Sequence, residues 1–119
     1  MSEAREWKGS CHCGNVRIDV TIDATSGITC NCSMCQRKGA VLQFVPASNF
    51  EQTAGEDAQT LYQFNKKVLD HLFCKTCGVT SFARGKGPDG TPMIAINLRC
   101  LEGIELDSVK TKQYDGRAS

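Results

Sequence analysis

The chain has 119 residues, of which 40% are hydrophobic, which is enough for one compact domain and too few for two ordinary ones. Its 14 basic and 13 acidic residues nearly cancel, leaving a net charge of +1 without a long run of either sign. This balance lacks the electrostatic footprint of a nucleic-acid-binding protein. We therefore expect a single domain over residues 1–119 that has no nucleic acid partner.

Residues 1–7 are polar and mixed in charge, with no apolar run of the length that a signal peptide or membrane span requires. We expect a cytoplasmic protein without a membrane partner. In a reducing compartment, the eight cysteines favour metal ligands or free thiols over disulfides. Their even number keeps disulfides as an alternative, although two cysteines in a C-x-C pair are poorly placed to bridge each other.

Short hydrophobic segments predict a series of strands along the chain. Residues 15–23 alternate cleanly, with Val16, Ile18, Val20 and Ile22 on one side, which predicts a half-buried strand. Further short β-like runs are separated by Gly, Pro, Asn and Asp, and they cover residues 41–45, 60–64, 69–73, 80–83, 93–98 and 109–114. The sequence therefore predicts a mainly β fold.

Little helix is expected. A short helical turn is predicted from Ser33, because Ser33 and Gln36 have the capping-box spacing and Gly39 suits a C-terminal stop. A simple loop at Ser33 is the alternative. Residues 46–59 are polar and predict a short turn or loop, and residues 85–90 predict a hairpin connection.

Seven of the eight cysteines fall into three groups, which is the most informative pattern in the chain. The groups are Cys11-His12-Cys13, Cys30-Asn31-Cys32-Ser33-Met34-Cys35 and Cys74-Lys75-Thr76-Cys77. Thiols grouped in this way are typical of zinc sites. Cys74 and Cys77, followed by Gly78, have the form of a zinc knuckle, which needs two further ligands.

Cys11 and Cys13, followed by Gly14, offer the matching pair. Closing a loop of roughly sixty residues between the two pairs costs only a few kcal/mol. Structural zinc contributes about 10–16 kcal/mol in small domains. We therefore expect a closed structural zinc site on four thiolates, namely Cys11, Cys13, Cys74 and Cys77.

The remaining group can place three sulfurs, from Cys30, Cys32 and Cys35, on a second zinc. A three-ligand site leaves one coordination position open for chemistry, and it should lose its metal more readily than a closed site. Cys100 can in principle complete the site. Its neighbours Leu98 and Leu101 instead favour a buried, inert thiol.

Neither histidine carries a clear functional signal. His12 lies between two predicted ligands and is expected to point away from their metal. His71 lies two residues ahead of Phe73 in a predicted strand, which favours a packing role. Neither has a partner that would indicate a catalytic triad.

Four sequence strings resemble the glutathione-dependent formaldehyde-activating enzyme family, and the chain resembles a short member of it. The strings occur in the family's order and the resemblance spans about residues 7–116. They are GSCHCG at 9–14, CNCSMCQRKGA at 30–40, FCKTCG at 73–78 and NLRCLEG at 97–103. The resemblance implies twisted antiparallel sheets of the Mss4-like type held together by zinc. It implies the same two zinc sites, with Cys30, Cys32 and Cys35 at the open one.

The activity that this resemblance implies is the condensation of glutathione with formaldehyde to S-hydroxymethylglutathione, classed as a carbon–sulfur lyase reaction. The chemistry of the second cysteine group agrees, because a three-thiolate zinc favours a soft sulfur donor at its open position. Coordination would also convert a thiol to its thiolate. A small-molecule thiol such as glutathione and an aldehyde are therefore the expected partners.

Glutathione carries two carboxylates, which require cationic contacts. Arg37, Lys38 and Arg99 flank the cysteine motifs and are the candidates, with a solvated surface charge as the alternative for each. The competing function is a non-enzymatic, zinc-folded binding module of the same fold, in which all seven grouped cysteines are structural.

Overall fold

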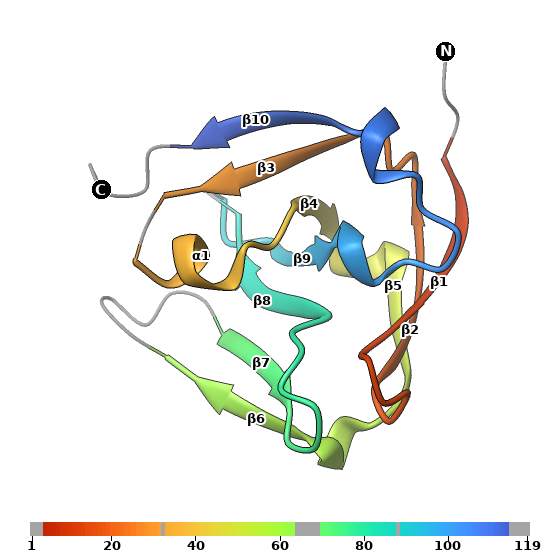
Figure 1. Cartoon of the computed structure of the whole chain (residues 1–119), viewed down its shortest axis with the longest axis vertical. Coiled ribbons are helices and arrows are strands. Elements are labelled where there is room, and N and C mark those ends of the chain that lie inside the picture. The colour runs from red at the N-terminus through yellow and green to blue at the C-terminus, as the bar shows by residue number, and fades with distance from the viewer. Residues whose placement is uncertain (1–3, 32, 64–69, 88, 115–119) are drawn as a thin grey trace.

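Strands dominate the computed structural model, which describes residues 4–31, 33–63, 70–87 and 89–114 (Figure 1). The strands are β1 (Arg5–Ser10), β2 (Arg17–Ile22), β3 (Ser26–Cys30), β4 (Leu42–Pro46), β5 (Phe50–Ala54), β6 (Gln59–Tyr62), β7 (Asp70–Cys74), β8 (Phe82–Lys86), β9 (Pro92–Asn97) and β10 (Lys110–Tyr114). The helical segments are α1 (Ser33–Lys38) and the 3-10 turns η1 (Ala47–Asn49), η2 (Glu56–Ala58), η3 (Leu98–Cys100) and η4 (Leu106–Ser108).

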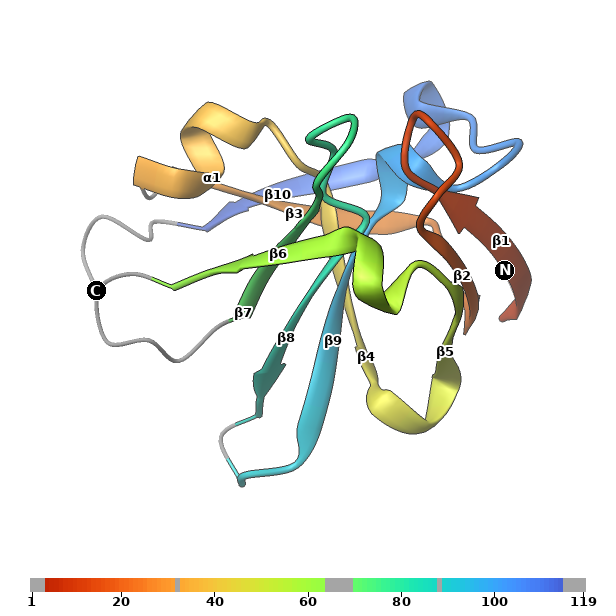
Figure 2. The ribbon, with the colours of Figure 1, turned by 90° about the horizontal axis from the view of Figure 1, so that it is seen from below.

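A small sheet has the order β1-β2-β5, and both of its pairs are antiparallel. The alternation predicted for residues 15–23 is confirmed in β2, where Ile18, Val20 and Ile22 are buried while Arg17 and Thr21 are exposed. Burying one face of β2 removes the branched side chains from water and fixes the register of the strand. The small sheet lies on the opposite side of the molecule from α1 in both views (Figures 1 and 2).

The larger sheet has the order β10-β3-β4-β9-β8-β7-β6 among the described residues. Its pairs are antiparallel except that β10 runs parallel to β3. The expected mainly β fold with antiparallel sheets is therefore confirmed, with one parallel pair at the edge. A parallel neighbour requires a long crossover, and here most of the chain lies between β3 and β10.

The core lies between the two sheets. Phe82, Ile96 and Leu98 have no exposed surface, and they pack with the buried face of β2. The ring of Phe50 on β5 tilts against that of Phe82, with 4.7 Å between ring centroids. This contact joins the small sheet to the large one through aromatic packing.

The short turn predicted within residues 46–59 is present, as η1 and η2, but the strand β5 between them was not predicted. The strands β1 and β3 were also not predicted. β1 and β5 carry few β-branched side chains, so pairing with β2, and not local propensity, determines their conformation.

The predicted helical turn and the predicted hairpin are confirmed. The helix α1 ends at Lys38, and the next residue, Gly39, has φ of +69° and donates its N–H to the Cys35 carbonyl oxygen at 2.9 Å. The predicted hairpin joins β8 to β9, with the Gly87 N–H bonded to the Thr91 carbonyl oxygen at 2.8 Å; residue 88 lies outside the described residues. Within the described ranges, no helix has the length and apolar character that crossing a membrane requires.

We expect Gly55→Ala to destabilise the chain more than Gly90→Ala. Both glycines have a left-handed backbone, with φ of +89° and +86°, so an alanine is strained at either position. An added Cβ at Gly55 would also overlap the backbone of Asn15 and Val16, whereas nothing lies within 4 Å of one at Gly90.

Chemical denaturation of the zinc-loaded variants measures the difference. Gly90→Ala should lower the free energy of unfolding by about 1 kcal/mol, and Gly55→Ala by at least about 2 kcal/mol more. Equal losses in the two variants would contradict the close approach of η2 to the turn after β1.

Candidate metal centre

The turn that follows β1 positions Cys11 and Cys13. The Cys11 N–H donates to the Val16 carbonyl oxygen at 3.0 Å, and the Gly14 N–H donates to the Cys11 carbonyl oxygen at 3.2 Å. Gly14 adopts φ of +83°, which only glycine accepts readily. The Val16 N–H also points at the Cys11 sulfur at 3.3 Å, which stabilises negative charge on that atom.

A second turn, after β7, repeats this arrangement with Cys74 and Cys77. The Cys74 N–H donates to the Val79 carbonyl oxygen at 3.1 Å, and the Gly78 N–H donates to the Cys74 carbonyl oxygen at 2.9 Å. Gly78 has φ of +80°. The Thr76 N–H approaches the Cys74 sulfur at 3.4 Å. Each turn therefore aims two sulfurs outward from a tight, hydrogen-bonded backbone.

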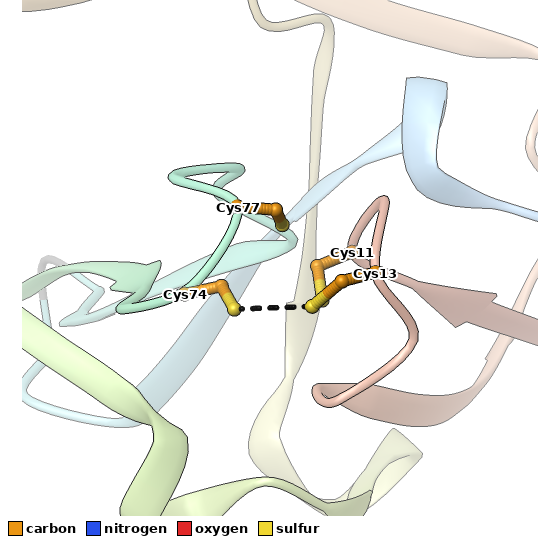
Figure 3. Close-up of side chains that lie close together, drawn as sticks. All are labelled: Cys11, Cys13, Cys74 and Cys77. Carbon is orange, nitrogen blue, oxygen red and sulfur yellow. Dashed lines mark hydrogen bonds between the residues drawn. The ribbon is translucent and has the colours of Figure 1, made fainter.

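The sulfurs of both turns converge on one point (Figure 3). All four Sγ atoms lie within 4.8 Å of one another. The Cys13 sulfur is 3.6 Å from the Cys11 sulfur and 3.6 Å from the Cys74 sulfur. Tetrahedral zinc with Zn–S bonds of about 2.3 Å requires sulfur separations of about 3.8 Å. The four residues predicted as one ligand set are thus brought together in an arrangement that can hold a metal ion.

The electrostatics of the four cysteine side chains also favour binding of a cation. The backbone N–H of Cys13, followed by that of Val79, lowers the pKa of Cys77 to about 6. The Cys77 N–H likewise lowers the pKa of Cys74. At Cys13 the Asn15 N–H lowers the pKa, but desolvation and the neighbouring sulfurs together raise it to about 11. Four thiolates repel one another at this distance, and a bound metal ion removes that penalty.

Cys100 lies outside this cluster but close to it. Its sulfur accepts a hydrogen bond from Asn97 Nδ2 at 3.7 Å and donates to the Thr80 carbonyl oxygen at 3.6 Å. Burial, and then the charges of Cys11 and Cys77, raise the pKa of Cys100. The Cys100 thiol therefore stays protonated beside the four-sulfur cluster.

The second cysteine group is only partly described. Cys30 ends β3 and Cys35 lies in α1, and both side chains are half-buried and have interaction partners within the chain. Cys32 lies outside the described residues. The three-sulfur ligand set of Cys30, Cys32 and Cys35 therefore stays a prediction.

A cleft of about 490 Å³ lies between α1 and the strands β6 and β7. The helix contributes Met34 and Lys38 to its lining, and the strands contribute Tyr62, His71 and Phe73. Residues 78–80, which close the second cysteine turn, form part of the same wall. Two of its lining residues, Met34 and Gly78, are the sequence neighbours of Cys35 and Cys77.

The structure separates the three predicted substrate cations. Lys38 is half-buried and lines the cleft. Arg37 is exposed, and its guanidinium donates to the Ser33 carbonyl oxygen at 2.9 Å within α1. Arg99 is exposed and its Nε donates to the Gly39 carbonyl oxygen at 3.1 Å, which ties η3 to the end of α1. Lys38 is therefore the best placed of the three to contact a ligand in the cleft.

His71, which the sequence predicts to pack, is buried but also lines the cleft, and so does Tyr62, for which the sequence predicts no functional role. The alternation of side chains along β7 could have indicated that His71 and Phe73 line the same surface. These two residues share one face of the strand, while Leu72 packs on the core. His12 is exposed, as expected for a residue that points away from the metal ligands beside it.

Comparison with known proteins agrees with these motifs. The family model described as glutathione-dependent formaldehyde-activating enzyme matches residues 6–114. Among solved structures, the crystal structure of a Rhodobacter sphaeroides protein is 32% identical, with a TM-score of 0.76. The similarity covers 88% of this chain and 99% of that one. The matched region includes all three cysteine groups.

Replacing Cys74 by Ala should remove the metal of the four-sulfur cluster. Cys74 is fully buried and its sulfur faces Cys13, so the variant should lose about one zinc per chain and much of its resistance to thermal unfolding. Cys100→Ala, a thiol outside the cluster, is the matched control and should keep its zinc. Elemental analysis and a melting curve test both, and wild-type zinc content in Cys74→Ala would contradict the assignment.

Proposed function

The chain belongs to the glutathione-dependent formaldehyde-activating enzyme family, and from this premise we propose that it is a zinc-dependent carbon–sulfur lyase acting on thiol–aldehyde adducts. Membership indicates an enzyme of the formaldehyde-activating kind. The finer proposal is that it joins glutathione and formaldehyde to S-hydroxymethylglutathione and also catalyses the reverse step. The observation that carries it is the family match across residues 6–114, supported by a cleft lined by α1, the helix that contains Cys35.

We assign different roles to the two cysteine groups. Cys11, Cys13, Cys74 and Cys77 would hold a structural zinc, because their sulfurs converge as a closed set of four. Cys30, Cys32 and Cys35 would hold a second, more labile zinc. When bound there, that zinc would supply an open coordination position and favour the thiolate form of the substrate.

The walls of the cleft suit a small thiol and its aldehyde adduct. Met34 and Phe73 contribute apolar surface, which limits the access of water to the reacting atoms. Lys38 provides a positive charge on the α1 side of the cleft. Of the three predicted cations, we propose that Lys38 contacts the bound substrate. Arg37 and Arg99 instead donate hydrogen bonds to backbone carbonyl groups.

The reaction is a balanced addition without oxidation or reduction. The thiol sulfur forms a bond to the carbonyl carbon, and the π-electron pair of the carbonyl moves to oxygen. The thiol loses a proton and the new hydroxyl group gains one. In the reverse direction the C–S bond breaks and thiol and aldehyde are released.

We expect Cys35→Ser to lose catalysis and to keep the four-sulfur site. Exchange NMR with [13C]formaldehyde and glutathione measures the rate at which the zinc-loaded protein interconverts free formaldehyde and its adduct. The variant should lose at least about 100-fold of the protein-dependent rate, because the open site loses a sulfur ligand. Cys100→Ala is the control and should exchange at the wild-type rate.

Two results would refute the proposal. One is a wild-type protein, loaded with zinc, that does not accelerate exchange over buffer. The other is a Cys35→Ser variant that exchanges as fast as the wild-type chain. The first result would favour the zinc-folded binding module over the enzyme. The second would show that the activity does not depend on the second cysteine group.

A further inference from the structure

The inner face of α1 points toward the cleft. Met34, Cys35 and Lys38 are half-buried, while Gln36 and Arg37 are exposed. Residues three or four positions apart lie on the same side of a helix, so Lys38 lies next to both Met34 and Cys35 on this face. Lys38, which lines the cleft, is therefore a neighbour of Cys35 in the second cysteine group.

The facing wall is built by the pair β6 and β7. Tyr62 and His71 are directly opposite each other in the antiparallel register, so their side chains lie on the same face of the sheet. Phe73 follows two positions later on that face, and all three line the cleft. A histidine thus lies across the cleft from the helix that carries Cys35.

The surroundings of His71 keep its imidazole neutral. The residue is 6% exposed, and burial followed by the charge of Lys38 lowers its pKa, with Asp70 opposing the change. A neutral imidazole has a lone pair that can accept a proton. Once protonated it lies near a second cation, so it readily gives that proton to a nearby anion.

We propose that His71 is a catalytic residue that carries the proton from the substrate sulfur to the aldehyde oxygen, while Lys38 stabilises the negative charge on that oxygen. This assignment rests on the proposed function and identifies the proton carrier that the reaction needs. The S–H bond breaks as His71 takes the proton, and the C–S bond forms while the carbonyl π bond opens. His71 then returns the proton to oxygen as the O–H bond forms, and the residue ends in its starting state.

A purely structural role for His71 makes a different prediction. A packing histidine would affect stability and ligand binding together with the rate, whereas a proton carrier affects mainly the rate. General acid–base catalysis typically contributes about 100-fold to 10,000-fold. The two roles therefore differ in how kinetics and affinity respond to the same substitution.

The test compares His71→Gln, Lys38→Met and Lys38→Arg with the wild-type chain, all loaded with zinc. Exchange NMR with [13C]formaldehyde and glutathione gives the rate, and calorimetry with glutathione alone gives the affinity. His71→Gln should lower the protein-dependent exchange rate by about 100-fold and change the glutathione affinity by less than about two-fold. Lys38→Met should lower the rate by about ten-fold, and Lys38→Arg should restore it.

The pH profile is an independent readout. His71 must be neutral to accept a proton, so the wild-type rate should fall as pH drops below the ordinary histidine pKa of 6.5. The charged groups that act on His71 are Lys38 and Asp70, with Tyr62 opposite it. His71→Gln should lack this acidic limb while keeping its zinc over the same pH range.

His12→Gln is the matched control, because His12 is exposed and is not part of the cleft lining. It should retain the wild-type rate and pH profile. A His71→Gln rate within about three-fold of wild type would overturn the assignment. A rate lost in parallel with zinc or glutathione affinity would also overturn it. A wild-type chain without activity would instead refute the proposed function, and this assignment with it.

Discussion

The convergence of four cysteine sulfurs connects the small sheet to the large one. Cys13 and Cys74 are 61 positions apart in sequence, yet their sulfurs lie 3.6 Å from each other. One turn follows β1 of the small sheet and the other follows β7 of the large sheet. Without a cation, the repulsion between thiolates would oppose this approach. A bound metal ion would convert that repulsion into a cross-link and supplement the aromatic contact between Phe50 and Phe82.

The second cysteine turn also builds one wall of the cleft. Residues 78–80 follow directly on Cys77, so the turn that presents two sulfurs also lines the cavity. Asn97, another lining residue, donates to the Thr80 carbonyl oxygen at 2.9 Å and holds this wall against β9. On the other side, Arg99 ties η3 to the end of α1 through Gly39. The closed four-sulfur cluster thereby supports the position of the cleft in which we place the chemistry.

The sequence predicted the features that local patterns encode, namely the alternation of β2, the stop at Gly39 and the pairing of two cysteine turns. It did not predict β1 and β5, whose conformation depends on pairing with β2. The cleft could not be predicted from the sequence. Tyr62 and His71 come to lie opposite each other only through the register between β6 and β7. Likewise, only packing of α1 distinguishes half-buried Lys38 from exposed Arg37.

The central claim is that one cysteine group is closed and structural while the other is open to a thiol. Zinc content combined with X-ray absorption at the zinc edge, before and after addition of glutathione, tests it most directly. The account predicts two zinc ions per chain and a mean sulfur coordination that rises toward four when glutathione binds. Two zinc ions that are already saturated with sulfur and do not respond to glutathione would contradict the account and favour a binding module.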